Sequence, residues 1–573
     1  MSFQIITHTP EQATQWRQLA ASNPSRVART LALAPGQKTR EGDNQGDVFP
    51  ALAAVVEAAR PVEGGRNEPW DRLVEAGVAE VLCYNVMNMT TTANFPPDTP
   101  AEILEEAKKA MPSSYAAALE ALRAATFNFQ TPPSRTDKRV IAALKKDWAG
   151  MMKRLWEQPE NTLIPTDSHI AERVAVAQIV VRVIISDPSF LSIFYRPNDL
   201  TIQIMARHWK HSTAVIDTRT TAGVLHGFLG PTHPHHITYV QAHPPSYPDI
   251  LSRIYLGVSP SPALSVPKQA KALVTTFAAH LPILSGSVAQ MDLEFFTQVF
   301  RLANTIEPEL VIATLKSTPF WNSAFRLMKK SAKSTEGLSE KEKEEDDRVR
   351  VSIMASVMGI SADLLHLATI KNSQECEPLV RIWANENFFG ALEESIEQLV
   401  AVRGITMQIS TISSVINGLI QNAQPPFVRL LGTQFPRWRL IGTILKHDIK
   451  RQGIEGPPQI SQSNDLPDPE SNIWDHGAWQ TLVSLQNACF DLGKTCAKRG
   501  CGNTGVSLCK CEAVLYCSDA CRTKDSEGHN IVCGWMGVLG NVGKQNTGSV
   551  EYDATSITPP SVKTTSGPLE GLD

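Results

Sequence analysis

A cluster of cysteines and one histidine near the end of the chain places the strongest constraint on its folding. Eight potential metal ligands lie between residues 496 and 533: Cys496, Cys501, Cys509, Cys511, Cys517, Cys521, His529 and Cys533. A segment this short cannot bury enough apolar surface to fold by itself. Structural zinc takes four thiolate or imidazole ligands, so eight ligands suit two ions. We therefore expect two Zn²⁺ ions, each contributing on the order of 10–16 kcal/mol to folding, because these soft ligands favour zinc over magnesium or calcium.

The rest of the sequence favours metal binding over disulfide bonds. The chain has ten cysteines, and seven of them fall in the cluster. Dense disulfide frameworks belong to small secreted domains, but the start, MSFQIITHTPEQATQW, lacks the basic region and apolar run of a signal peptide. The most apolar window, residues 174–185, is interrupted by Gln178 and Arg182 and is too short to span a bilayer. We expect a soluble, intracellular protein, in the cytoplasm or the nucleus.

The second half of the cluster has a specific spacing. Residues 516–533, YCSDACRTKDSEGHNIVC, follow C-x3-C-x7-H-x3-C with Tyr516 directly before Cys517. This pattern resembles the MYND-type zinc finger. The resemblance implies a small cross-braced finger in which two zinc sites interleave along the sequence. The first ion would be held by Cys496, Cys501, Cys517 and Cys521, and the second by Cys509, Cys511, His529 and Cys533.

The two leading cysteine pairs depart from the family's C-x2-C spacing. Four residues separate Cys496 from Cys501, and only Lys510 separates Cys509 from Cys511. A longer first loop can be absorbed in the fold. We expect the shorter second loop to distort the second site without abolishing it.

Fingers of this family often bind proline-rich peptides through a Gln directly after the sixth cysteine and a Trp four residues later. Arg522 and Ser526 stand at those positions, whereas Asp525 is retained. Arginine has no hydrogen-bond acceptor, and serine offers no aromatic surface. We therefore do not expect the usual proline-rich peptide mode.

Residues 48–455 carry apolar residues at three- and four-residue steps, the pattern of amphipathic helices. One such stripe consists of Phe388, Leu392, Ile396 and Leu399, and we expect its helix to stop at Gly404. A second stripe follows Asp292 and consists of Leu293, Phe296, Phe300 and Ala303. Residues 71–82, DRLVEAGVAEVL, resemble the helix–Gly–helix corner of an armadillo repeat, with Gly77 at the corner. The predicted fold class is mostly α: an armadillo/HEAT-like solenoid or an irregular helical body, followed by the finger.

The remaining segments complete the predicted organisation. Residues 1–47 are expected to be a partly ordered N-terminal segment, and the polar, Pro-rich residues 456–472 a linker. A helix over residues 473–495 is expected to lead into the finger at 496–533, and residues 540–573 are expected to be disordered. The histidine-rich residues 226–243 are expected to form a loop, with a metal site as the less favoured alternative.

These features favour a non-enzymatic, zinc-binding adaptor with protein partners. One alternative is a SET-type lysine methyltransferase carrying a MYND finger, but its Asn-His-Ser/Cys stretch is missing, as are H-E-x-x-H and G-x-S-x-G. Another is a nucleic-acid-associated regulator, since basic residues surround the finger: Lys494, Lys498, Arg499, Lys510, Arg522 and Lys524. Interspersed acidic residues and a net charge of −4 argue against it. We expect no catalytic residue, no organic cofactor and no membrane contact.

Overall fold

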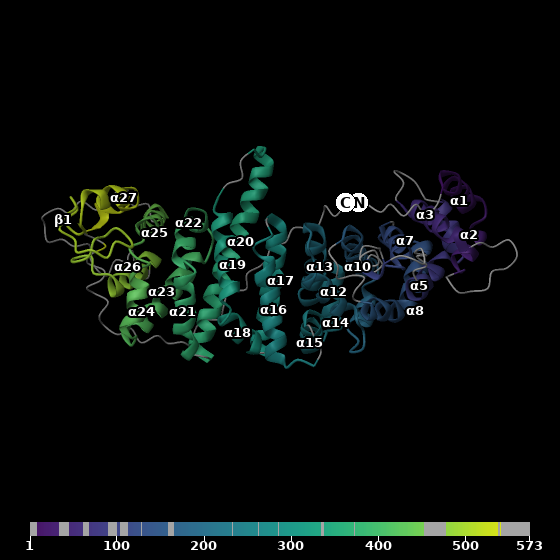
Figure 1. The fold of residues 1–573 in the computed structure, drawn as a ribbon, viewed down its shortest axis with the longest axis horizontal. Coiled ribbons are helices and arrows are strands. Elements are labelled where there is room, and N and C mark those ends of the chain that lie inside the picture. The colour runs from purple at the N-terminus through teal and green to yellow at the C-terminus, as the bar shows by residue number, and fades with distance from the viewer. Residues whose placement is uncertain are drawn as a thin grey trace. The chain divides into compact units, whose positions relative to one another are not determined.

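The protein is almost entirely helical in the computed structural model. The structure describes residues 9–33, 45–60, 68–89, 100–102, 113–127, 129–158, 166–231, 233–259, 261, 263–284, 286–306, 308–333, 337–371, 373–451, 477–536 and 539. Within these ranges the only strands are β1 (Ser507–Leu508) and β2 (Leu515–Tyr516), and helices make up most of the ribbon in Figure 1. The predicted fold class, mostly α with a small cysteine-rich module, is therefore confirmed. The predicted linker (456–472) and disordered tail (540–573) lie outside the described residues.

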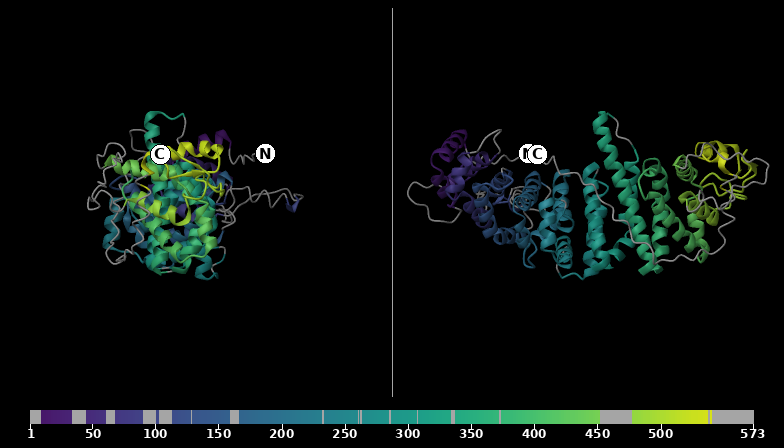
Figure 2. Two further views of the ribbon diagram at one scale, coloured as in Figure 1. Left: turned by 90° about the vertical axis from the view of Figure 1, so that its left-hand side faces the viewer. Right: turned by 180° about the vertical axis from the view of Figure 1, so that it is seen from behind.

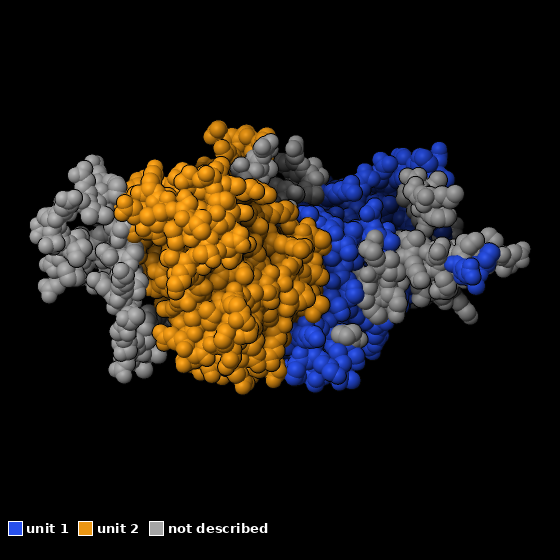
Figure 3. All heavy atoms as spheres, turned by 60° about the vertical axis from the view of Figure 1, so that its left-hand side comes forward, with its two compact units in different colours: residues 1–273, 301–307, 565–573 blue, residues 274–300, 308–564 orange. Residues whose placement is uncertain are grey.

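The described chain separates into two compact units, coloured in Figure 3. Unit 1 contains the described residues up to 273 together with 301–306, and unit 2 contains residues 274–300 and the described residues from 308 onward. Two helices, α16 (Val266–His280) and α17 (Gly286–Ile306), have residues in both units. Each unit is described separately below.

Unit 1 is built from a series of helices stacked along the chain (Figures 1 and 2). They are α1 (Pro10–Ser22), α2 (Pro24–Leu31), α3 (Val48–Ala59), α4 (Glu68–Glu75), α5 (Val78–Asn88), α7 (Ala116–Phe127), α8 (Arg135–Glu157), α10 (Asp167–Ser186), α11 (Leu191–Phe194), α12 (Thr201–Lys210), α13 (Val215–Leu229), α14 (Pro234–Ala242) and α15 (Tyr247–Val258), with 3-10 turns at Gln45–Asp47 and Pro188–Phe190. Here α5 packs on α8 and α7 on α10, whereas α10 packs on α13 and α12 on α15, in each of these last two cases the third described helix after it. Gly77 has φ +90° at the corner between α4 and α5, as its sequence context predicts.

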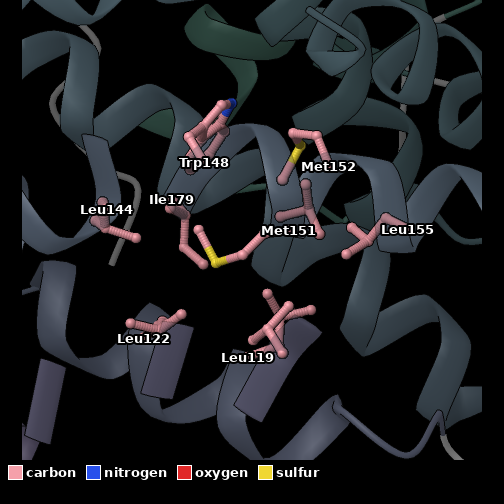
Figure 4. A pocket seen from close by; sticks show the side chains of 10 residues that line it. Leu119, Leu122, Leu144, Trp148, Met151, Met152, Leu155 and Ile179 are labelled. Atoms are coloured by element: carbon pink, nitrogen blue, oxygen red, sulfur yellow. The ribbon is translucent and has the colours of Figure 1, made fainter. Parts of the chain in front are cut away.

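The core of unit 1 is apolar and closely packed. Figure 4 shows Leu119 and Leu122 of α7 facing Trp148 and Met151 of α8 across a small space. That space measures about 10 Å³ and has only apolar walls. It is no larger than a single water molecule requires, and it offers a water no polar partner. It is therefore a packing gap in the core.

Buried polar side chains also join the helices of unit 1. Glu172 accepts hydrogen bonds from the backbone N–H (2.8 Å) and hydroxyl (2.6 Å) of Ser113. Its neighbour Arg173 donates to Asp217 from Nε (2.9 Å) and Nη2 (2.7 Å), and both side chains of this ion pair are fully buried. Burial raises the pKa of Glu172 to about 7. The charge state of unit 1's interior therefore changes near neutral pH.

In unit 2 a helix repeatedly packs on the third one after it, and the unit contains the cysteine-rich module. Its elements are α18 (Pro308–Leu315), α19 (Thr318–Ser331), α20 (Glu340–Lys371), α21 (Cys376–Asn385), α22 (Phe388–Leu399), α23 (Ile405–Gln421), α24 (Pro425–Gly432), α25 (Trp438–Arg451), α26 (Ala478–Cys489), β1, β2 and α27 (Asp519–His529), with 3-10 turns at Ser373–Glu375 and Cys533–Trp535. Here α19 packs on α22, α20 on α23, α22 on α25 and α23 on α26. An aromatic series runs through the core: Phe277, Phe296, Phe320, Trp321, Trp383, Phe388, Phe389 and Phe435.

The two predicted apolar stripes are buried, but one helix limit differs from that expected. All eight stripe residues are at most 3% exposed. Helix α22 ends at Leu399, and Gly404, with φ +87°, begins α23 instead of ending α22. The second stripe lies within α17, which begins at Gly286, and Asp292 is fully buried inside this helix.

One other expectation about secondary structure is wrong, and another holds with narrower bounds. The histidine-rich residues 226–243 form the end of α13 and the whole of α14, because Pro234 occupies the first turn of a helix, where proline is well tolerated. No group of three or more potential ligands forms there among the described residues. The helix expected over 473–495 is described only as α26, since from Phe490 the chain turns toward the bridge between Thr495 and Thr504.

One helix of the described chain, α20, is long and apolar enough to cross a membrane by length and composition. The bent pair of α10 with residues 188–194 passes the same test only as a pair. In α20, 56% of the apolar window is buried against other parts of the protein. Burial of that kind is expected of a core helix.

Candidate metal centre

The cysteine-rich module, residues 496–533, is a small hairpin followed by one helix, and we call it the finger. β1 and β2 pair antiparallel, with Ser507 opposite Tyr516 and Leu508 opposite Leu515. α27 begins where the Ser518 hydroxyl accepts a hydrogen bond from the backbone N–H of Cys521 (3.3 Å), the usual role of a helix-capping serine. The hairpin and the helix thus bring sequence-distant cysteines to common points.

The first ligand set consists of Cys496, Cys501, Cys517 and Cys521. The sulfur atom of Cys501 lies 3.5 Å from that of Cys517 and 3.8 Å from that of Cys521, and Cys517 lies 3.5 Å from Cys521. All four sulfur atoms lie within 4.8 Å of one another. A tetrahedral ion with Zn–S bonds near 2.3 Å requires sulfur separations of about 3.8 Å. The first set therefore has the chemistry and spacing of a zinc site.

The second ligand set consists of Cys509, Cys511, His529 and Cys533. Nε2 of His529 lies 3.4 Å from the sulfur of Cys509 and 3.5 Å from that of Cys511. Cys509 and Cys533 are 3.9 Å apart through their sulfur atoms. Three thiols and one imidazole within this span also suit zinc. The structure thus brings together the same two groups of four that the resemblance implied.

The shortened Cys509–Cys511 loop is accommodated by a tight turn. Glu512 adopts the left-handed conformation, with φ +59°, and its N–H donates to the carbonyl of Cys509 (2.9 Å). Glu512 is one of two non-glycine residues with positive φ among the described residues, so the backbone here is locally strained. This turn lets Cys511 face the same point as Cys509 despite the missing residue.

Crowding of the thiols shifts their pKa values in opposite directions. Hydrogen bonds from Cys501 and Cys521 lower the pKa of Cys517 to about 7. In the same ligand set, burial raises the pKa of Cys496 to about 12. One thiol in such a group ionises readily while its neighbours keep protons that a divalent cation can replace. The groups are therefore suited to exchange protons for a metal ion.

The finger packs against α25 of the helical body within unit 2. A Cβ atom added to Gly442 would lie 2.5 Å from Ile531 and 2.8 Å from Val532 of the finger. Glu393 of α22 accepts hydrogen bonds from Arg437 (2.9 Å) and from Arg499 of the finger (2.7 Å). These contacts join the body to the finger through both packing and charge.

The positions that depart from the family's peptide-binding residues make local contacts. Arg522 pairs with Asp519 of its own helix (2.8 Å), and the Ser526 hydroxyl donates to the carbonyl of Thr523 (2.7 Å). Asp525 faces inward, where one of its oxygens accepts hydrogen bonds from Tyr516 (2.7 Å) and from Trp438 of α25 (3.1 Å). Sequence reasoning missed Trp438, because 87 residues separate it from Asp525 and no local pattern connects them.

Comparison of the chain with protein-family models, with curated proteins and with solved structures found no match. Assignment of a function therefore depends on the two ligand groups and on the helical body that carries them.

Proposed function

We propose that this chain is a non-enzymatic protein-interaction protein in which a MYND-type finger holds two Zn²⁺ ions at the end of an armadillo-like helical body. The interleaved order of the ligands along the sequence supports the MYND-type assignment. The packing of a helix on the third one after it, in both units, supports the armadillo-like assignment, because armadillo repeats contain three helices. A stacked helical array presents a long surface for partners.

One observation carries this proposal: two groups of four ligands, each drawn from separated parts of the segment 496–533, meet within zinc-binding distance. In each zinc site the thiolates and, in the second, the imidazole of His529 would bind the ion, and the bound zinc would supply the structural stability of the finger. Zinc-dependent folding also requires reduced thiols, which agrees with the expected intracellular location.

The direct test is native mass spectrometry of the full chain with and without a chelator. We expect two zinc ions per chain, one in Cys511→Ser, and two in the control Cys489→Ser, whose thiol lies outside both groups and donates to the carbonyl of Leu485. A wild-type chain that binds no zinc would overturn the proposal. One ion in the wild type would restrict it to the first site.

The interaction role needs a separate test. We expect specific protein partners to be captured by the zinc-loaded chain and lost from the double variant Cys517→Ser/Cys533→Ser. Failure of the folded chain to capture any specific partner contradicts the adaptor proposal. Binding of S-adenosylmethionine in calorimetry would favour the methyltransferase alternative instead. A DNA or RNA mobility shift that persists at moderate salt would favour a nucleic-acid partner.

A further inference from the structure

The histidine ligand of the second site is held by a residue of the helical body. The ring of Trp438, the first residue of α25, packs edge-on against the His529 ring, with centroids 5.3 Å apart and planes at 70°. Tyr516 also lies edge-on to His529, at 6.2 Å and 78°. The imidazole is 2% exposed. It therefore lies between two aromatic rings, one from the finger and one from the body.

Asp525 fixes both rings at once. The same carboxylate oxygen accepts the Tyr516 hydroxyl (2.7 Å) and the Trp438 indole N–H (3.1 Å). A charged acceptor makes such hydrogen bonds shorter and stronger than neutral ones. A rotation of either ring away from His529 would break its bond to Asp525. The two rings and the carboxylate thus form one rigid group around the imidazole.

This packing replaces the usual support of a zinc-bound histidine. Such a histidine normally donates its second ring nitrogen to a carboxylate, a carbonyl or water, which fixes the orientation of the ring. Here Nε2 faces Cys509 and Cys511, whereas the buried Nδ1 has no hydrogen-bond partner within the described part of the chain. Orientation of the ring must therefore come from the aromatic contacts.

We propose that Trp438 and Asp525 are positioning residues for the second metal site, so that helix α25 belongs to the outer shell of this zinc ion. The inference depends on the zinc binding proposed above and adds a coupling between metal binding in the finger and docking of α25. Because coupling is reciprocal, the docked helix strengthens metal binding and bound metal strengthens docking of the helix. The contacts recorded for the first site's sulfur atoms all lie within the finger, to one another, Asn503 and Ser518.

The experiment measures the affinity of each site separately. The full chain is titrated with Co²⁺, which occupies tetrahedral zinc sites and gives distinguishable visible spectra at the first site, with four sulfur ligands, and at the second, with three sulfurs and one nitrogen. Zinc is then added to displace the bound Co²⁺, which gives the zinc affinity of each site. We expect Trp438→Leu and Asp525→Ala to weaken binding at the second site by about 10- to 100-fold, the usual effect of losing an outer-shell partner. Binding at the first site should be unchanged.

Two further variants separate positioning from general destabilisation. Trp438→Phe keeps a ring against His529 but loses the hydrogen bond to Asp525, so it should restore part of the lost affinity. The matched control Trp383→Phe alters a buried indole of the unit 2 core, which contacts Trp321 and Phe388, and should leave both sites unchanged. Equal weakening of both sites in Trp438→Leu and Asp525→Ala, or unchanged affinity at the second site, would overturn the inference. Absence of any metal in the wild type would instead contradict the proposed function.

The reciprocal effect provides a second readout. Loss of the second ion in Cys533→Ser should increase hydrogen exchange of the backbone amides of α25 more than loss of the first ion in Cys501→Ser. Equal exchange of α25 in these two variants would contradict the coupling.

Discussion

Replacement of Gly442 by alanine tests the contact between finger and body with the smallest possible change. The added Cβ would lie 2.5 Å from Cγ2 of Ile531 and 2.8 Å from Cγ1 of Val532, where ordinary carbon contacts are about 3.5–4.0 Å. Val532 is fully buried, so it has little freedom to move away. Overpacking of this kind typically costs about 1–3 kcal/mol.

Alanine also favours the helical conformation over glycine by roughly 0.5–1 kcal/mol, which offsets part of the clash. We therefore expect Gly442→Ala to weaken docking of the finger by up to about 2.5 kcal/mol, the difference between these two ranges. Gly418 in α23 is the matched control, because a Cβ there meets no atom within 4 Å. Gly418→Ala should stabilise its helix by roughly 0.5–1 kcal/mol.

Native-state hydrogen exchange of the zinc-loaded full chain is the suitable assay, because a chain with two compact units need not unfold in a single step. Protection should fall in α25 and α27 for Gly442→Ala and rise in α23 for Gly418→Ala. If both substitutions raise protection equally, Ile531 and Val532 do not pack on α25 as described, and the reasoning is refuted.

Three other predictions concern the metal and the buried charges. Chelation of zinc should increase exchange in α25 and α27 while leaving α19 unchanged, and equal loss of protection in all three would indicate general unfolding. Asp217→Ala removes the carboxylate that faces the buried guanidinium of Arg173, so the free energy of unfolding of unit 1 should fall by about 3–5 kcal/mol. A loss well below that range in chemical denaturation would contradict the presence of a buried ion pair between these two residues. Glu172 has a folded pKa of about 7, above its ordinary value of 4.5, so its contribution is fully present below pH 4.5 and is lost as the pH rises through 7. Glu172→Gln should therefore stabilise unit 1 more at pH 8 than at pH 5, by about 1 kcal/mol or more, since one pKa unit corresponds to about 1.4 kcal/mol. An effect on the free energy of unfolding that does not change with pH would refute the raised pKa of Glu172.

The sequence is informative where chemistry and periodicity are local. Cysteines and the histidine at fixed intervals predict a metal cluster, because few other arrangements explain so many ligands in one short segment. Apolar stripes predict which faces of α17 and α22 are buried, because helical geometry repeats every 3.6 residues. Gly77 is predictable for a similar reason, since a sharp corner between two helices favours a residue that tolerates positive φ.

Contacts between segments that are distant in the sequence cannot be predicted from local spacing and periodicity. Proline can begin a helix or interrupt one, so the position of Pro234 alone did not distinguish α14 from a loop. The contact of Trp438 with the finger joins segments far apart in the sequence, and a single sequence carries no signal for such a pair.

The ion pairs at Glu393 have a consequence for how this sequence can change. Its largely buried carboxylate serves Arg437 and Arg499 together, although Arg499 is 106 residues away. Replacement of the glutamate alone would leave two neighbouring positive charges facing each other, which is destabilising. Among descendants of a common ancestor, substitutions at these three positions should therefore occur together, and their joint variation would record the contact between finger and body in sequence data alone.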